Sequence, residues 1–259
     1  APAELMRAVL KARTDLLWFG GIGTYVKSSK ETHADVGDKA NDSLRVNGAE
    51  LRALVVGEGA NLGVTQRGRI EYAEKGGRIN TDFLDNSGGV NSSDVEVNIK
   101  ILTTDIMSGK SSGMDIKARN KLLEKMTGEV AAHVLRNNYQ QAQAISLAEL
   151  QAPENLQMQE EFIQDLEREK ILNRELEALP GQETLTQRRN AGKGMTRPEL
   201  CLLLSYSKIA FTRDLLASNI PDRADMQDWV THYFPADLRK KYEKNILRHR
   251  LRREIVATS

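Results

Sequence analysis

Residues 51–61 read LRALVVGEGAN. An apolar run rich in valine and leucine ends there in closely spaced glycines, which is typical of a strand buried on both faces of a parallel sheet. Residues 15–23 and residues 78–89 have the same form, an apolar run followed by glycines. Residues 65–75, between the runs at residues 51–61 and 78–89, have the length of a short crossover helix, and a glycine pair that can end this helix follows them. The sequence therefore predicts an α/β fold with three parallel strands.

The three glycine clusters each come directly after a predicted strand. Because the carboxyl ends of parallel strands meet at one edge of a sheet, and because ligands bind in the crevice at that edge, we expect the clusters to form one ligand site. The alternative is that each cluster is only a turn between a strand and a helix, where glycine is also common. After the third cluster, Asn91 or Ser92 can cap a helix that continues through Leu102.

The composition excludes several classes of protein. With 259 residues, of which 40% are apolar and 28% charged, the chain can bury a core and is not disordered throughout. A net charge of +1 gives no bulk imbalance that favours nucleic acid or a membrane surface. One cysteine excludes a disulfide framework and a zinc site built on several thiolates. The sequence shows no targeting segment and no apolar run of the ~20 residues that span a membrane, so we expect a cytoplasmic protein.

Glycines become rare along the chain: 13 of the 19 lie before residue 91, and only two lie after residue 190. Helical periodicity takes over in the second half, where apolar residues recur at steps of three or four. We therefore expect two domains, an α/β domain over residues 1–108 and an all-α helical domain over residues 109–259.

The expected helical domain has an internal pattern of its own. We predict a helix over about residues 155–179, a polar and mobile connection over residues 181–195, and a further helix that Thr196 caps. Charge is segregated, with a net −5 over residues 154–177 and a net +5 over residues 235–254. The basic segment could bind nucleic acid, but its single aromatic residue favours a solvated face or pairing with acidic helices. The four histidines show no metal-ligand spacing, so no metal site is expected.

Two ordered motifs are familiar: GEGAN at residues 57–61, and NSGGV at residues 86–90 followed by Ser93. The pair resembles a Gly-Ala-Asn loop and an Asn-x-Gly-Gly-Val-x-x-Ser segment of the glutamate dehydrogenase superfamily. Within it, the sequence is most similar to the large bacterial NAD-specific glutamate dehydrogenases. The segments that carry this closer resemblance are residues 18–28, 37–42, 65–70 and 80–82, and it continues more loosely through residues 196–200 into the helical part.

The resemblance implies a partial doubly wound (Rossmann-like) parallel sheet followed by an all-α helical domain, with NAD as the cofactor. Asn61 would hydrogen-bond near the nicotinamide ribose, and Asn86 would hold the nicotinamide amide. The glycines that the resemblance assigns to the dinucleotide are Gly20, Gly21, Gly23 and Gly59.

By the same resemblance, Ser93 would bind the distal carboxylate of L-glutamate. We expect Ser93 in the first turn of a helix, where free amide hydrogens and the positive end of the dipole favour an anion. Its other role would be a helix cap, with Glu96 completing a Ser-x-x-Glu box, and the two roles do not exclude each other. After Ser93 the sequence departs from the small hexameric enzymes, because Asp94 and Val95 stand in place of an aromatic pair.

Some expected parts of a complete enzyme are missing from the sequence. No Gly-x-Gly-x-x-Gly stands between a predicted strand and a helix, so the pyrophosphate-binding turn is not predicted. The resemblance places the catalytic lysine and aspartate in an upstream domain, so no catalytic residue is expected here. The chain starts without methionine and ends within a helical pattern. We therefore expect a fragment of an NAD-dependent glutamate dehydrogenase that is inactive by itself.

The complete enzyme would oxidatively deaminate L-glutamate to 2-oxoglutarate and ammonia in amino-acid catabolism, with hydride transfer to NAD. Its expected partners are the remainder of its own chain and further copies in a homo-oligomer, but neither nucleic acid nor a membrane. The alternative is a non-catalytic helical interaction or regulatory module in which the glycine clusters are only turns. Geometry separates the two, because the enzyme requires the loops at Gly20, Asn61 and Asn86 to converge at one sheet edge.

Overall fold

The structure, a computed structural model, describes residues 1–109 and 114–258. It contains two compact units, each built from two separated parts of the chain. The first unit consists of Ala1–Ser87 and Gln140–Tyr206, and the second of Gly88–Tyr139 and Ser207–Ser259. Residue 108, the expected domain boundary, is the last residue of helix α5 (Ser87–Ser108) and belongs to the second unit. The division into residues 1–108 and 109–259 therefore stays a prediction about the parent protein.

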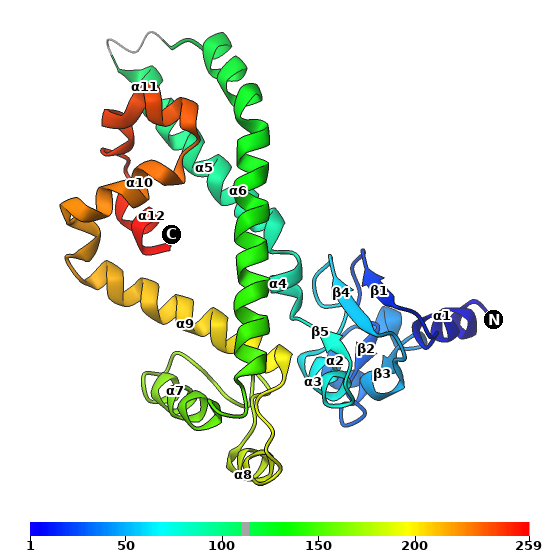
Figure 1. The fold of residues 1–259 in the computed structure, drawn as a ribbon. Helices are drawn as coiled ribbons and strands as arrows, with labels where there is room; N and C mark the ends of the chain where they lie inside the picture. Colours follow the sequence, from blue (N-terminus) through cyan, green and yellow to red (C-terminus); the bar gives the residue numbers. More distant parts are fainter. Residues whose placement is uncertain (110–113, 259) are drawn as a thin grey trace. The chain divides into compact units, whose positions relative to one another are not determined.

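A three-stranded parallel sheet lies in the first unit (Figure 1). Its strands, in spatial order, are β1 (Leu16–Phe19), β4 (Val55–Glu58) and β5 (Arg78–Ile79). Each strand lies in one of the three predicted apolar runs, and both pairings are parallel, as expected. The third strand is shorter than its run, because helix α4 (Asp82–Asp85) begins within it. A second parallel pair joins β2 (Val26–Lys27) to β3 (Val46–Asn47).

Helix α3 (Gln66–Glu74) is the predicted crossover between β4 and β5, and it packs on the sheet. Thr65 caps it by accepting a hydrogen bond from an amide of the first turn at 3.0 Å. Tyr72 reaches from the helix to the carbonyl of Ala53, to which its hydroxyl donates at 2.7 Å. The buried side chains of this core are Leu10, Phe19, Val26, Val46, Leu51, Ala53, Val56, Val64, Tyr72 and Ile79.

The remaining helices of the first unit differ from the predictions in two places. Helix α7 ends at Arg168 rather than near residue 179, and Lys170, with a φ of 58°, lies just beyond its end. Helix α8 occupies part of the stretch that was expected to be a mobile connection. Its sequence is polar, and it is anchored by the buried Leu185 and by Arg188 rather than by an apolar stripe. Besides α3 and α4, the helical elements that lie wholly in the first unit are α1 (Pro2–Leu10), α2 (His33–Val36), η1 (Lys39–Asn41), η2 (Gly48–Glu50), α7 (Leu156–Arg168) and α8 (Gln182–Asn190).

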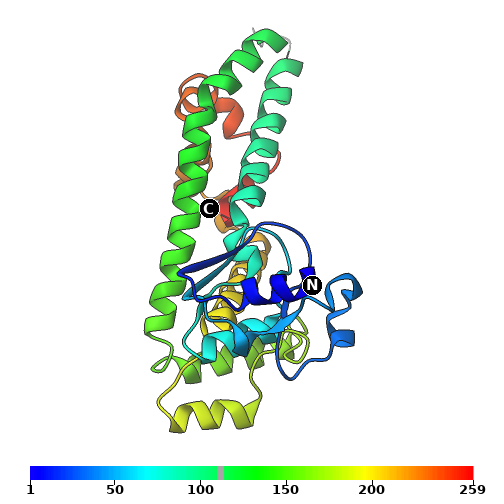
Figure 2. The ribbon, with the colours of Figure 1, turned by 90° about the vertical axis from the view of Figure 1, so that its right-hand side faces the viewer.

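The regular structure in the described part of the second unit consists of helices. Three long helices contribute residues to both units: α5, α6 (Ile116–Leu150) and α9 (Arg197–Ala217). The elements that belong to the second unit alone are η3 (Ile220–Asp222), η4 (Ala224–Met226), α10 (Gln227–Tyr233), α11 (Ala236–Ile246) and α12 (Arg252–Thr258). Figure 2 shows α5 beside α6. The buried core includes Val95, Ile99, Leu102, Ile106, Met126, Val230, Phe234, Leu238, Ile246 and Ile255.

The basic segment at residues 235–254 is paired with acidic side chains inside the second unit. Arg252 contacts Asp222 at 2.6 Å, and Arg250 donates to Asp105 at 3.1 Å. These pairs favour the interpretation that the basic helices form ion pairs with acidic side chains of the same chain. Across the described part of the chain, no helix has the length and apolar character that crossing a membrane requires.

Candidate functional site

The predicted loops follow three parallel neighbours in one sheet and therefore lie at one edge of it. Gly20 follows β1 directly, Asn61 follows β4, and Asn86 follows β5 after the short helix α4. Two contacts join the loops. The amide of Gly59 donates to the carbonyl of Phe19 at 2.9 Å, and Nδ2 of Asn86 donates to Oδ1 of Asn61. The three loops converge, as the enzyme interpretation requires.

The asparagine pair leaves hydrogen-bonding groups free toward the surface. In the described residues, Nδ2 of Asn61 and Oδ1 of Asn86 have no protein partner. The pair therefore offers one donor and one acceptor at the sheet edge. A carboxamide and ribose hydroxyls need such a mixture of donors and acceptors, so the side chains fit the nicotinamide half of NAD. The roles of Asn61 and Asn86 toward a cofactor stay predictions.

Trp18 is a residue of this edge that sequence reasoning missed. It pairs with Gly57 in the β1–β4 register, and its side chain is 56% exposed. A Cβ atom added to Gly57 would lie 2.6 Å from the indole, and one added to Gly59 would lie 2.5 Å from it. Both glycines thus make room for the ring. The sequence held one signal of this contact: a tryptophan in one predicted strand, and two glycines, two residues apart, at the end of the next predicted strand. The sequence does not show that they meet, because the contact depends on the register of the two strands.

The glycines after β1 differ from one another. Gly23 has a φ of +119°, a conformation that side chains rarely adopt, and a Cβ there would approach Asn41 Nδ2 to 2.7 Å. A Cβ on Gly21 would meet nothing within 4 Å. The fold therefore requires glycine at position 23, whereas packing gives no reason for glycine at position 21. Close approach of a ligand to the Gly20–Gly21 backbone would supply that reason, and it stays a prediction.

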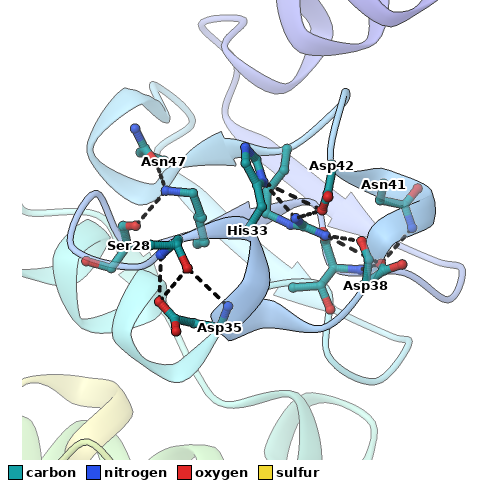
Figure 3. Close-up of polar contacts among 11 residues, drawn as sticks. Ser28, His33, Asp35, Asp38, Asn41, Asp42 and Asn47 are labelled. Carbon is teal, nitrogen blue, oxygen red and sulfur yellow. Dashed lines mark hydrogen bonds and ion pairs between the residues drawn. The ribbon is translucent and has the colours of Figure 1, made fainter.

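Figure 3 shows the polar network that organises the segment after Gly23. The guanidinium of Arg45 is buried, donating to the carbonyls of Thr24 at 2.8 Å and of Asp38 at 2.6 Å and pairing with Asp42. Asp38 accepts from the amide of Thr24 at 2.8 Å and from Asn41 Nδ2 at 2.7 Å. These two hydrogen bonds lower the pKa of Asp38. The segment is therefore held by side-chain contacts to its backbone, with little regular structure.

Lys27, in β2, is a lysine that is only 9% exposed. Its ammonium donates to the side chain of Asn47 at 2.8 Å and to the carbonyl of Ser28 at 3.0 Å (Figure 3). Lys27 thus links β2 to β3. Across the described chain, no group of three or more His, Cys, Asp or Glu side chains has a metal-binding arrangement.

Buried charges lie beneath the converging loops. Glu58, at the end of β4, is fully buried and binds Arg69 through both carboxylate oxygens, at 2.7 and 3.0 Å. Burial raises the pKa of Glu58, and Arg69 opposes that rise. Asp85 accepts from the amide of Glu58 at 2.9 Å and from Asn80 Nδ2 at 2.7 Å, and burial raises the pKa of Asp85. Sequence reasoning named none of these residues as part of the site.

Ser93 does not lie where the sequence predicted. Helix α5 begins at Ser87, so Ser93 is in its second turn and Asn91 and Ser92 are not its caps. Amide groups in the second turn donate to carbonyls of the same helix, so the argument from free amide hydrogens fails, and so does the capping box with Glu96. The hydroxyl-bearing side chain of Ser93 is exposed. Ser93 belongs to the second unit, whereas the other six predicted site residues belong to the first.

A separate pocket of about 1280 Å³ lies in the first unit, and it contains none of the seven predicted site residues. Its walls include charged side chains of both signs that pair with one another. Arg174 contacts Glu167 at 2.7 Å, and Arg188 contacts Glu199 at 2.7 Å. These contacts stabilise the walls of the pocket, and they do not indicate a particular ligand.

Comparisons with known proteins identify the family. A family model described as the catalytic domain of bacterial NAD-glutamate dehydrogenase matches residues 1–148, and a glutamate dehydrogenase C-terminal model matches residues 192–259. The chain is 55% identical to an NAD-specific glutamate dehydrogenase of Pseudomonas aeruginosa, 52% identical to one of Halomonas elongata and 47% identical to one of Mycobacterium tuberculosis. Each comparison covers 100% of this chain and 16% of the relative. Because the catalytic-domain model matches more than half of its length, the chain belongs to the bacterial NAD-glutamate dehydrogenase family.

Proposed function

We propose that this chain supplies the nicotinamide-side wall of the dinucleotide cleft in an NAD-dependent glutamate dehydrogenase. The observation that carries the proposal is the Asn61–Asn86 pair, which stands at the carboxyl edge of the parallel sheet beside the glycine loop after β1. The free amide of Asn61 would donate to the ribose, and the free carbonyl of Asn86 would accept from the carboxamide. Gly20, Gly21, Gly23 and Gly59 would form the backbone surface along the dinucleotide.

The reaction of the complete protein is proposed to be oxidative deamination of L-glutamate to 2-oxoglutarate and ammonia. NAD, when bound, accepts the hydride from the substrate. The residues of this chain would orient the nicotinamide and exclude water from one side of it. Ser93 is proposed to meet the distal carboxylate of L-glutamate through its exposed hydroxyl. The catalytic residues are proposed to lie in a part of the protein outside this chain.

The finer architecture belongs to the same proposal. We infer that β1, β4 and β5 form part of a doubly wound, Rossmann-like sheet within residues 1–108, followed by an all-α C-terminal domain. The parallel order β1-β4-β5 and helix α3 on the sheet support this inference. The partners would be the remainder of the protein and further copies of it in a homo-oligomer. A cytoplasmic location is proposed with them, and it suits the single, free Cys201.

Activity assays test the proposal on two proteins, this chain and the product of the complete reading frame that encodes it. We expect glutamate-dependent NADH formation only from the longer protein. There, Asn86→Ala should raise the KM for NAD about fivefold, since a lost hydrogen bond costs roughly 1 kcal/mol. Ser93→Ala should raise the KM for glutamate about tenfold or more, because its partner is charged.

Asn190→Ala is the matched control, because Asn190 is an exposed asparagine of α8 in the same unit as Asn86. It should leave both KM values unchanged. Unchanged kinetic constants in Asn86→Ala and Ser93→Ala would remove those two residues from the site.

A further inference from the structure

Arg69 is a buried cation that contacts carboxylates of two elements beside the converging loops, β4 and α4. It lies on α3, is 4% exposed, and forks onto Glu58 with Nε at 2.7 Å and Nη2 at 3.0 Å. Nη2 also lies 3.2 Å from Oδ1 of Asp82. The remaining nitrogen, Nη1, donates to Oε1 of Gln66 at 3.2 Å. Every nitrogen of the guanidinium is thus engaged, and two carboxylates from different elements, β4 and α4, share one cation.

Each of these carboxylates in turn holds the backbone of the loop after β4. Oε1 of Glu58 accepts from the amide of Val64 at 3.0 Å, and Oδ2 of Asp82 accepts from the amide of Leu62 at 2.8 Å. Leu62 has a φ of 60°, a left-handed conformation that leucine rarely adopts. The loop therefore keeps an unfavourable backbone conformation next to Asn61, and the two carboxylates that meet at Arg69 hold it on both sides.

The second asparagine depends on the same cation. Asp82 is the first residue of α4, and Asn86 follows the last residue of that helix. The amide of Asn86 donates to the carbonyl of Asp82 at 2.9 Å. Fixing Asp82 therefore fixes the short helix that presents Asn86. Through Glu58 and Asp82, a chain of contacts connects Arg69 to the backbone that carries each member of the asparagine pair.

Stability alone is a weak reason for this arrangement. Burying an ion pair costs desolvation, and apolar groups of the same volume often stabilise a core equally well or better. A guanidinium that bridges two carboxylates gives defined geometry instead, because its donors point in fixed directions. We propose that Arg69 is a positioning residue that holds Asn61 and Asn86 in register for the nicotinamide half of NAD, an inference that rests on the proposed function.

The test uses the product of the complete reading frame and two conservative variants, Arg69→Lys and Arg188→Lys. Arg188 is a matched control, because it is also buried in the first unit between two carboxylates, Glu199 at 2.7 Å and Glu74 at 3.1 Å. A lysine ammonium cannot fork onto one carboxylate while it reaches a second. We expect Arg69→Lys to raise the KM for NAD at least about tenfold, and Arg188→Lys to leave it unchanged.

Thermal unfolding of both variants separates positioning from stability. A merely structural role would lower the melting temperature of each and leave the KM for NAD of the folded enzyme unchanged. An unchanged KM in Arg69→Lys, or an equal rise in Arg188→Lys, would overturn the proposal. If Arg69→Lys does not fold, Asp82→Asn keeps the size of the side chain and removes its charge. That variant should raise the KM for NAD about threefold or more, and an unchanged value would also overturn the proposal.

Asn86→Ala, assayed in parallel, distinguishes the two levels of inference. A raised KM for NAD in Asn86→Ala with an unchanged KM in Arg69→Lys would refute positioning by Arg69 and leave the proposed site standing. Unchanged values in both would refute the proposed site itself.

Discussion

Gly59, the residue after β4, lies against the indole of Trp18 in β1, so this glycine of the GEGAN motif has a packing role. The conformation of Gly59 does not require glycine, because its φ lies outside the left-handed range. The requirement comes from the indole, which would lie 2.5 Å from an added methyl group. Gly59 therefore has a packing role in the protein besides its proposed role toward the dinucleotide. Only the second of these roles was expected from the sequence.

Gly59→Ala should destabilise the chain by about 1–3 kcal/mol, the usual cost of overpacking. Urea unfolding measures the change. Gly21→Ala is the control, because a methyl group there meets nothing within 4 Å, and it should change the free energy of unfolding by less than about 1 kcal/mol.

A second variant makes the cause specific. In a Trp18→Leu background, the indole is absent and Gly59→Ala should cost little. Equal destabilisation in both backgrounds would show that contact with Trp18 is not the reason for glycine at position 59.

At the scale of elements, the connection between α11 and α12 depends on a buried histidine. Nδ1 of His249 accepts from the amide of Leu251 at 3.1 Å, so Nε2, which lies 3.1 Å from the carbonyl of Asn98, carries the proton. Protonation at Nδ1 would break the contact with Leu251. Burial, which disfavours the charged imidazole, lowers the pKa of His249 below 6.5. The connection is therefore built for the neutral ring.

The second unit should consequently lose stability in mild acid. Because the folded-state pKa of His249 is depressed, its contribution is complete above the unfolded value of 6.5 and falls as pH drops through the folded value. The melting temperature of the chain should decrease between about pH 7.5 and 5.5. His249→Gln should flatten this dependence, whereas His232→Gln, at an exposed histidine of α10, should not. The same slope in wild type and His249→Gln would contradict the assignment.

At the scale of the whole molecule, β1 is a sheet edge. Among the described strands it pairs with β4 alone, and Leu16 and Trp18 on one of its faces are more than half exposed. An open edge strand with exposed apolar side chains is a template for pairing with another chain. The chain by itself should therefore self-associate through β1.

Sedimentation velocity over a range of protein concentrations tests this expectation. Leu16→Lys should shift the distribution toward the monomer, because a charge on the edge opposes pairing. Leu176→Lys is the matched control, since Leu176 is an exposed leucine of the same unit that lies in a turn outside the strands. A monomer at every concentration in the wild-type chain would refute association through this edge.

The three parallel strands, the crossover helix α3 and the family could be predicted from the sequence, because short apolar runs and ordered motifs are local signals. Tertiary structure decided what depends on residues far apart in the chain. Helix α8 has a polar sequence, and the buried side chains of Leu185 and Arg188 hold it in place. Lys27 can be buried because the side chain of Asn47 accepts a hydrogen bond from its ammonium group. The early start of α5 moved Ser93 into its second turn, since the glycines that suggested a loop are helical. The contacts of Arg69 with Glu58 and Asp82 form only when β4, α3 and α4 pack together. Each of these buried charges has its partner on another element, so no local sequence pattern could predict the pairing.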